Sequence, residues 1–568
     1  MYRTEDILDD FERKIVVRLP KKPGGCNSSI HFAKKRSSKG FKGGKTIGLF
    51  HPYCNAGGGG EKVLWCAVRA LQLKYPESKL VVYTGDVDTT TSDILRQCRN
   101  KLNIDIPGHI EFVYLHRRRW VEADMYPWFT LLGQSLGSVV LGFEALAAFT
   151  PDIYIDTMGY AFTLPLFKYF GGCQVASYVH YPTITCDMVS RVQIRVSAHN
   201  NRAMIANSAT LTAGKLAYYK LFAWMYRLVG CCSDTIMVNS SWTQAHINEL
   251  WECPGKTYRV YPPCDVNDFK AISMLVDKDK KFGAGKTIKI ISLGQFRPEK
   301  DHPLQLHALH RLRDILPVEL WDNIKLVIIG SCRNEDDQRR VLSLKDLCKE
   351  LSLEGNVVFR VNITYEELKQ ELGEGTIGLH TMWNEHFGIG IVELMAAGLI
   401  MVAHRSGGPL MDIIQETEGS RNGFLASNKE EYAEAFAAIV KMSPQERQII
   451  RDSARASVDR FSVQEFEIKH RNRHCENSAR LVDFVSMVIR PQEDCIGMLR
   501  DYSDRSILGH MIANAAIRGT GQDLIWPINQ WMDVRMVSAE IVMEERSDHA
   551  LLLPARDCTV LVKRAEQN

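Results

Sequence analysis

Two glutamates stand eight residues apart in the stretch HTMWNEHFGIGIVELMAAG, residues 380–398. The pattern predicts that a strand ends near His380, that Glu385 lies in the following loop, and that a helix beginning near Gly388 carries Glu393. The free N–H groups at the start of a helix can hold a diphosphate. Glu393 can then accept hydrogen bonds from a ribose diol, and Glu385 can accept them from the hydroxyls of a transferred group.

Two cations follow another predicted strand, in the stretch SLGQFRPEKDH at 292–302. Arg297 and Lys300 can place two positive charges on a leaving diphosphate, whose oxygens gain negative charge as it departs. The alternative is that both side chains form surface salt bridges.

A glycine-rich stretch, HPYCNAGGGGEK at 51–62, follows a short apolar run and leads into a helical pattern. Four glycines are therefore predicted between a strand and a helix. Adjacent glycines cost backbone entropy, so bare backbone is required there. Gly58, Gly59 and Gly60 are expected to bring main-chain N–H groups close to an anion. A flexible loop is the alternative, and neither a P-loop nor the usual dinucleotide fingerprint is matched.

Two further stretches follow predicted strands. YVHYP at 178–182 puts His180 at the end of a predicted strand, which we expect to face a cleft between the two halves of the chain, although a lone histidine is more often structural. HRSGGPLMDII at 404–414 adds another glycine pair after a strand.

The elements that must hold these residues alternate between strands and helices, which predicts parallel sheets. The predicted strands of the first half are 46–50, 80–84, 110–115, 152–156, 174–180, 235–239 and 258–261; those of the second are 288–293, 325–329, 357–359, 376–380 and 399–403. The fold class is α/β, with two Rossmann-like domains facing a cleft in which ligands collect.

Four segments follow from this pattern. We expect a basic arm at 1–44, an N-terminal Rossmann-like domain at 45–276, a C-terminal Rossmann-like domain at 277–470, and an unassigned tail at 471–568. A Lys/Asp/Gly stretch at 277–286 separates the two domains.

Composition narrows the class of protein. The net charge of +3 argues against a dedicated nucleic-acid binder. Six Lys or Arg residues and no acid lie between Cys26 and Lys45, which indicates a solvated basic arm or attraction to an anionic membrane. The 15 cysteines form no CxxC pairs and no zinc pattern, so reduced thiols in a cytosol-facing protein are expected. The polar first forty residues predict no signal peptide.

Two apolar stretches are candidates for membrane contact. Residues 129–149 are long enough to span a bilayer, but Gln134 and Glu144 interrupt them, so a buried or membrane-touching helix is favoured over a span. Residues 216–230 are rich in aromatic side chains and suit a bilayer interface, with an ordinary packed helix as the alternative.

The Glu-x(7)-Glu element, the Arg/Lys pair, the glycine loop and the two serial α/β domains together resemble the retaining glycosyltransferases of the GT-B fold. NSSWT at 239–243 and VYPPCD at 260–265 are similar to that family's interdomain border. Within it, HPYCNAGGGGEKVLWCAVRALQ, SYVHYPTIT and SLGQFRPEKDHPLQL resemble the dolichol-pathway α-1,2-mannosyltransferases of asparagine-linked glycosylation. The resemblance covers about residues 45–466.

The resemblance implies GDP-mannose as donor and trimannosyl-chitobiosyl-diphosphodolichol as acceptor, bound by the N-terminal domain. It implies addition of two successive α-1,2-linked mannoses with retention, without a metal or other cofactor. The implied location is the cytosolic face of the endoplasmic reticulum membrane. The implied partners are the membrane surface and other dolichol-pathway mannosyltransferases, and no nucleic acid is expected.

Carried onto this sequence, the resemblance assigns two groups of residues. The catalytic residues are His180, Glu385, Arg297 and Lys300; the donor-binding residues are Gly58, Gly59, Gly60, Arg297, Lys300, Phe387, Gly388, Ile389 and Glu393. Many relatives have arginine where this chain has Gln295, so the phosphate role falls on Arg297. A related enzyme with another nucleotide sugar or acceptor, or a catalytically silent scaffold, remains the alternative.

Overall fold

The computed structural model describes residues 44–185, 188, 192, 209–272, 287–332, 334–416 and 421–467. The predicted basic arm, apart from residue 44, lies outside the described residues. The Lys/Asp/Gly stretch at 277–286 and the predicted tail at 471–568 also lie outside them.

Seven of the described strands form a parallel sheet in the first half, in the order β3-β2-β1-β4-β5-β6-β7. They are β1 (Thr46–Phe50), β2 (Lys79–Thr84), β3 (Glu111–Tyr114), β4 (Ile153–Asp156), β5 (Gln174–Val179), β6 (Thr235–Val238) and β7 (Thr257–Arg259). The strand order reverses between β1 and β4, where open α/β sheets leave a crevice at the carboxyl ends of the strands.

Six strands form the second parallel sheet, in the order β10-β9-β8-β11-β12-β13. They are β8 (Ile288–Leu293), β9 (Ile324–Gly330), β10 (Val357–Val361), β11 (Gly375–His380), β12 (Ile400–His404) and β13 (Gly423–Ala426). The order reverses between β8 and β11, the strands that end next to the predicted Lys300 and Glu385 loops. β13 is an addition to the predicted strands: it has only four residues and begins with glycine, so the sequence carries little strand signal there.

Helices cover both faces of each sheet. In the first half they are α2 (Gly59–Lys74), α3 (Thr91–Leu102), α4 (Thr130–Ala148), α7 (Ala209–Gly230), α8 (Ser241–Trp251) and α9 (Val266–Lys270), with the short helices η1 (Arg118–Val121), η2 (Ala123–Met125), η3 (Ala161–Thr163), η4 (Leu166–Phe170) and η5 (Pro254–Lys256). In the second half they are α10 (His302–Ile315), α11 (Val318–Trp321), α12 (Glu335–Glu350), α13 (Tyr365–Glu374), α14 (Ile389–Ala396), α15 (Lys429–Lys441), α16 (Pro444–Ser457) and α17 (Val463–Glu467), with η6 (Pro298–Lys300), η7 (Pro409–Ile413) and η8 (Asp459–Phe461).

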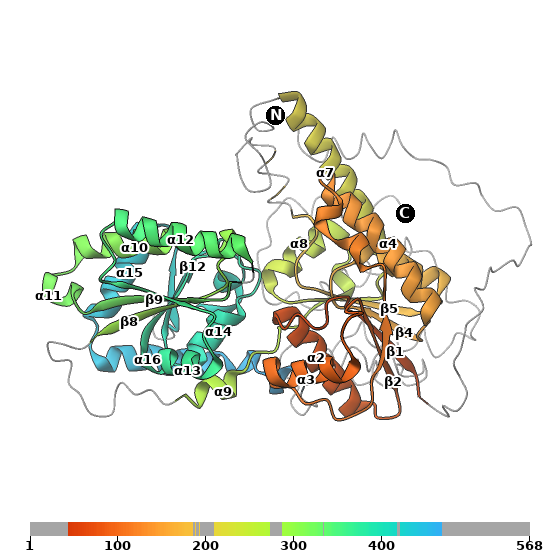
Figure 1. The fold of residues 1–568 in the computed structure, drawn as a ribbon, viewed down its shortest axis with the longest axis horizontal. Helices are drawn as coiled ribbons and strands as arrows, with labels where there is room; N and C mark the ends of the chain where they lie inside the picture. The colour runs from red at the N-terminus through yellow and green to blue at the C-terminus, as the bar shows by residue number, and fades with distance from the viewer. Residues whose placement is uncertain are drawn as a thin grey trace, which may run out of the picture. The chain divides into compact units, whose positions relative to one another are not determined.

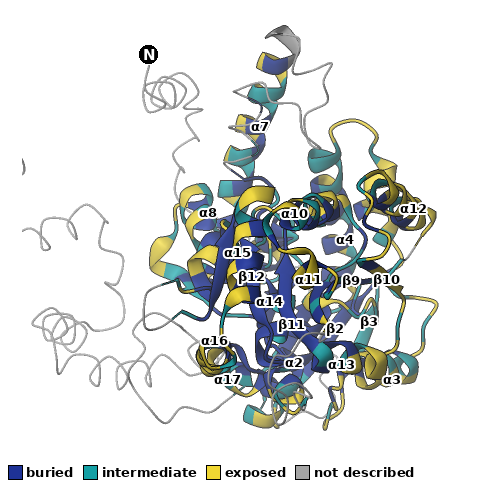
Figure 2. Ribbon diagram, turned by 90° about the vertical axis from the view of Figure 1, so that its left-hand side faces the viewer, coloured by how far each residue is buried: buried dark blue, intermediate teal, exposed yellow. Residues whose placement is uncertain are grey.

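Because both faces are covered, the strands read as continuous apolar runs. In the second half α10, α12 and α15 lie over one face of the sheet, and α13, α14 and α16 lie over the other (Figure 1). Figure 2 shows the strands buried and the outward faces of the helices exposed. Every residue of β11 is buried, and the loop that carries Glu385 leaves this strand after His380.

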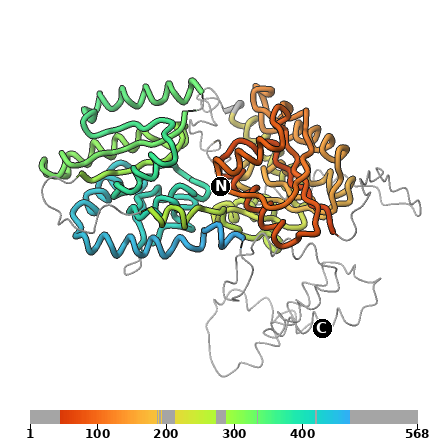
Figure 3. Tube along the Cα trace, turned by 60° about the horizontal axis from the view of Figure 1, so that its bottom comes forward, coloured from red at the N-terminus to blue at the C-terminus, as the bar shows by residue number. Residues whose placement is uncertain are grey.

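The described chain ends by returning to the first half. Arg69 of α2 binds Glu467 of α17 at 2.8 Å, and the backbone of Cys264 pairs with that of Ser462. Figure 3 shows this last, blue segment leaving the second half. The returning helix thus lies within the range predicted for the C-terminal domain.

Candidate active site

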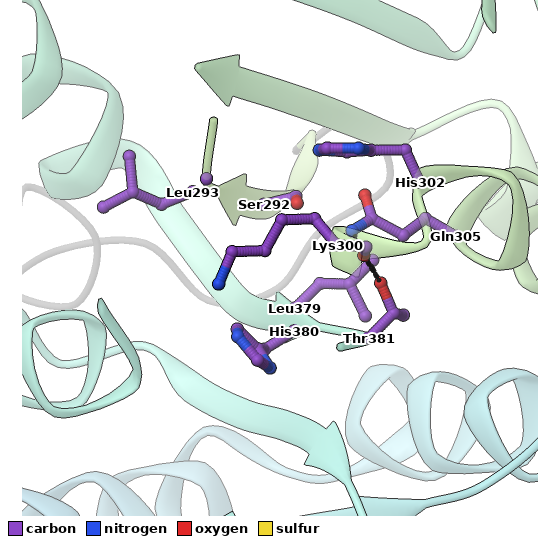
Figure 4. Close-up of a pocket in the computed structure, with 9 residues that line it drawn as sticks. Ser292, Leu293, Lys300, His302, Gln305, Leu379, His380 and Thr381 are labelled. Atoms are coloured by element: carbon purple, nitrogen blue, oxygen red, sulfur yellow. Dashed lines mark hydrogen bonds between the residues drawn. The ribbon is translucent and has the colours of Figure 1, made fainter. Parts of the chain in front are cut away.

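Glu385 lies at the centre of a charged cluster in the loop between β11 and α14. Its Oε2 atom is 2.6 Å from Lys300 Nζ and 3.1 Å from His380 Nε2. Because a carboxylate only accepts hydrogen bonds, Nε2 is the protonated nitrogen of His380 in this contact. Figure 4 shows Lys300 extending toward His380.

The cluster fixes the charge of Glu385. Burial alone would raise the pKa of this carboxyl, but the hydrogen bond from His380 and the charge of Lys300 outweigh burial and hold the pKa well below its usual range. Burial, together with the charge of Lys300, lowers the pKa of His380 more than Glu385 raises it. At neutral pH the site therefore holds an ionised carboxylate beside a neutral imidazole.

The backbone beneath Lys300 is held by two polar side chains that the sequence did not single out. Thr381 donates to the Lys300 carbonyl at 2.7 Å, and Gln305 donates to the Thr381 hydroxyl at 2.9 Å. Both line the small pocket drawn in Figure 4. Nothing in the sequence distinguishes Gln305 from a surface glutamine of α10. The position of His380 at a predicted strand end, five residues before Glu385, was the available signal for that histidine.

Arg297 lies apart from this cluster. Its nearest acid is Glu299, at 3.6 Å, and within the described ranges no ion pair joins it to Glu385. Its Nε atom is buried and has no hydrogen-bond partner there. The structure brings Lys300 onto Glu385 and leaves an N–H group of Arg297 for another acceptor, so the role of Arg297 stays a prediction.

The glycine pair after β12 supports the Glu385 loop by close approach. Gly408 N donates to the Glu385 carbonyl at 2.8 Å. A Cβ atom on Gly407 would lie 2.3 Å from the same carbonyl oxygen, and one on Gly408 would lie 2.4 Å from the carbonyl oxygen of Phe387. Only glycine permits this contact, so the second glycine pair shapes the loop that carries the carboxylate.

The helix after that loop begins as predicted. Gly388 caps α14 with φ +112°, a conformation that favours glycine. Phe387 is buried and packs against Tyr261 and Phe461, so only its backbone is placed for ligand contact. Ile389 opens the helix and its side chain faces the first half.

The first glycine loop differs from the prediction at its end. α2 begins at Gly59, so two of the four glycines lie inside the helix, and Gly57 at φ +77° is the position in the loop that favours glycine. A Cβ atom on Gly59 would lie 2.9 Å from Ile389 Cδ1, and one on Gly60 would lie 3.8 Å from His180 Nε2. The glycines thus let α2 approach two other candidate residues.

His180 follows β5 and meets this loop. Its Nε2 atom is 3.1 Å from the Thr157 carbonyl, which only accepts, so Nε2 is protonated and Nδ1 is left as an acceptor. Burial, with a smaller effect from His51, lowers the pKa of His180 to about 4. His51 in turn binds Thr157 Oγ1 at 2.8 Å and Glu61 at 3.3 Å. A neutral His180 is therefore held on a buried polar network.

Glu393 meets partners that the sequence did not predict. Lys62 reaches from α2 to Asp265, at 2.5 Å, and to Glu393, at 3.6 Å. Burial raises the pKa of Glu393 to about 6, because Lys62 offsets burial only in part and Asp265 adds repulsion. The same pairing raises the pKa of Lys62. We assign its ammonium mainly to Asp265, the closer carboxylate. Two features of the sequence could have indicated these partners of Glu393: Lys62 comes directly after the glycine loop, and Asp265 lies in VYPPCD.

Within the described ranges, no group of three or more His, Cys, Asp or Glu residues is arranged to hold a metal ion.

The fold is shared with known proteins. Solved structures that share it include a glycosyltransferase from Rickettsia africae ESF-5, 14% identical with a TM-score of 0.51, covering 78% of this chain and 97% of that one. Sucrose-phosphate synthase from Thermosynechococcus elongatus is 15% identical with a TM-score of 0.52, covering 74% and 96%. Residues 276–456 match the family model described as glycosyl transferases group 1. The predicted GT-B architecture is confirmed, and the class is that of glycosyltransferases.

The chain also matches a narrower family within the glycosyltransferases. Residues 44–251 match the model described as ALG11 mannosyltransferase N-terminus. Over 432 residues the chain is 56% identical to the human GDP-Man:Man(3)GlcNAc(2)-PP-Dol alpha-1,2-mannosyltransferase. The matched region covers 76% of this chain and 87% of the human protein. The Caenorhabditis elegans protein of the same description is 45% identical over 433 residues, with coverage of 76% and 91%. The chain belongs to this family of alpha-1,2-mannosyltransferases, as the motifs predicted.

Proposed function

We propose that this chain transfers mannose from GDP-mannose to the dolichol-linked glycan Man(3)GlcNAc(2)-PP-Dol, adding two α-1,2-linked residues in succession. The donor and acceptor are those that the relatives' descriptions name. The observation that carries the proposal is the contact between Lys300 and the ionised Glu385 where the second sheet opens toward the glycine loop of the first.

The chemistry assigned to these residues is a substitution at the anomeric carbon of mannose, in which the acceptor hydroxyl attacks from the same face that GDP leaves. GDP leaves with the electron pair of the bond from that carbon to phosphate, and the acceptor hydroxyl forms the new bond and loses its proton to a phosphate oxygen. Lys300 stands where it can attract both the diphosphate and Glu385. Glu385 accepts hydrogen bonds from mannose hydroxyls, and the N–H groups opening α14 bind phosphate. The mannosyl bond of GDP-mannose is itself α, so an α product requires retention.

The reaction is proposed to need neither a metal nor another cofactor. Lys300, Arg297 and backbone N–H groups at Gly58–Gly60 and Gly388 then carry the positive charge that the departing diphosphate requires. The acceptor side of the cleft is assigned to His180, whose Nδ1 atom can accept a hydrogen bond from a sugar hydroxyl.

A membrane surface is proposed as a partner, because α4 and α7 turn apolar stripes outward. The exposed residues of these stripes are Leu136 and Phe143 on α4 and Leu221, Trp224 and Leu228 on α7. Before α4, Trp128 is 75% exposed. Figure 2 shows the exposed outer side of α7. Among the described helices, α4 alone has the length and composition of a membrane span, a weak sign by itself. Aromatic and apolar side chains of this kind suit the bilayer interface.

The dolichol-linked acceptor also supports a location at the endoplasmic reticulum membrane. The cytosolic face is proposed because the chain's many cysteines fit a reducing compartment; the free cysteines among the described residues include buried Cys54 and Cys66. Other mannosyltransferases that act on the same lipid are proposed as partners, since each consumes the product of the one before.

The identity of the nucleotide is tested by calorimetry. GDP should bind, with UDP and ADP at least about tenfold weaker, a difference of about 1.4 kcal/mol. Equal binding of all three would support a related enzyme with another donor, and no binding of any would support a silent scaffold.

A further inference from the structure

Three aromatic rings meet beside the candidate active site. Tyr181 and His386 have ring centroids 4.1 Å apart, and His386 and Trp242 have centroids 5.1 Å apart. The planes of Tyr181 and Trp242 differ by only 4°. We call Tyr181, Trp242 and His386 the aromatic cluster.

The aromatic cluster joins the two segments that carry catalytic candidates. Tyr181 directly follows His180, and His386 directly follows Glu385. Trp242 is buried behind them, whereas Tyr181 is 40% exposed. The most exposed member of the cluster therefore lies one residue along the chain from His180, on the side of the site that the first half supplies.

The cluster is held in place by the NSSWT segment, which the mechanism so far leaves without a role. Asn239 donates to the His180 carbonyl at 2.9 Å. Ser241 donates from both its backbone N and its hydroxyl to the buried carboxylate of Asp412, at 2.8 and 2.6 Å. Rings fixed in this way are preorganised for a rigid partner.

A sugar ring fits such a surface. One face of a pyranose carries C–H groups, which pack on the negative face of an aromatic ring, while the hydroxyls at the rim find polar partners. Burial lowers the pKa of His386 to about 4, so its ring is neutral at physiological pH. A nucleotide base is the other flat candidate. The cluster, however, adjoins His180 and Glu385, the residues placed beside the transferred sugar, and not Glu393, the residue placed on the ribose.

We propose that the aromatic cluster is an acceptor subsite, in which Tyr181 stacks on a mannose ring of the glycan and brings its neighbouring hydroxyl to the anomeric carbon held beside Glu385. The identity of the glycan rests on the proposed function; the stacking itself does not.

The test uses the full-length protein and the free glycan Man(3)GlcNAc(2) as probe. Saturation-transfer NMR should show contact between aromatic protons and C–H groups of a mannose ring. Tyr181→Ala should weaken glycan binding about tenfold, the scale of one lost aromatic contact. Tyr181→Phe, which keeps the ring, should bind far better than Tyr181→Ala. Tyr169→Ala, which removes an exposed aromatic ring from η4, is the matched control.

Kinetics separate this proposal from the proposed function. With the lipid-linked acceptor, Tyr181→Ala should raise the acceptor KM about tenfold and the GDP-mannose KM much less. If the wild type transfers mannose and Tyr181→Ala has an unchanged acceptor KM, the subsite is wrong and the function stands. If the wild type does not transfer mannose but binds the glycan through Tyr181, the subsite stands and the function fails. A larger effect on GDP binding than on glycan binding would assign the cluster to the base.

Discussion

At the residue scale, we expect catalysis to depend on the ammonium of Lys300. Lys300→Ala should lower kcat about a hundredfold, about 3 kcal/mol, because this charge is needed most as negative charge grows on GDP. Lys300→Arg should restore little, since a forked guanidinium does not match the geometry of a point charge 2.6 Å from Glu385. Steady-state kinetics at saturating GDP-mannose measure this. Lys345→Ala, an exposed lysine of α12, is the control. Near-normal turnover of Lys300→Ala would contradict the assignment.

The raised pKa of Glu393 predicts that donor binding depends on pH. Its pKa is raised to about 6, so the carboxyl gains a proton as the pH falls through that value. A carboxylate accepts hydrogen bonds from ribose hydroxyls better than the protonated acid does. GDP affinity should therefore fall about tenfold between pH 7 and pH 5. Calorimetry across this range measures it, and Glu393→Gln should flatten the profile. If Glu393→Gln keeps the pH dependence of the wild type, another titrating group causes the fall in GDP affinity.

His180 should act on the sugar and not on the nucleotide. His180→Ala should lower transfer about tenfold while GDP affinity changes only a few fold, since loss of one hydrogen bond can cost about 1.5 kcal/mol. The measurement is kcat from transfer assays together with the GDP Kd from calorimetry. Parallel loss of both would indicate that the Thr157 contact of His180 is purely structural.

At the element scale, two loops approach each other through glycine. Gly408→Ala should displace the Glu385 loop, because the new Cβ would lie 2.4 Å from the Phe387 carbonyl oxygen. We expect a loss of about 1–3 kcal/mol in unfolding free energy and a lower kcat. Gly355→Ala is the matched control, since no heavy atom lies within 4 Å of its new Cβ. Thermal unfolding of both variants measures the difference. If both variants lose the same unfolding free energy, the Glu385 loop accommodates the new methyl group without loss of stability.

Some helices and strands could be predicted from the sequence alone. The bounds of β1 and β8 match their predicted ranges, because a strand covered on both faces is a continuous apolar run. α7 begins at Ala209, earlier than the predicted 216–230, because residues 209–215 are mostly small or polar and do not extend the apolar run. The contacts of Lys62 with Glu393 and of Ser241 with Asp412 join residues far apart in the chain, and no local pattern records them.

At the scale of the whole molecule, the outward stripes of α4 and α7 predict binding to lipid. The protein should float with phosphatidylcholine–phosphatidylserine vesicles, be released by detergent, and resist high salt, because the contact buries apolar surface. Replacing both Trp224 and Leu228 with serine should reduce flotation. Leu342→Ser, which changes an exposed leucine of α12, is the control. Quantitative release by salt or carbonate alone would show that these stripes do not enter the bilayer.

The most direct test of the central claim is a reconstituted transfer reaction. Purified full-length protein is incubated with GDP-mannose and Man(3)GlcNAc(2)-PP-dolichol, with and without a chelator of divalent cations, and the product is examined by mass spectrometry and linkage analysis. The proposed function predicts two added mannoses, both α-1,2-linked, formed equally well with the chelator and lost in Lys300→Ala. No transfer to this acceptor, a β linkage, or activity that requires a divalent cation would contradict it.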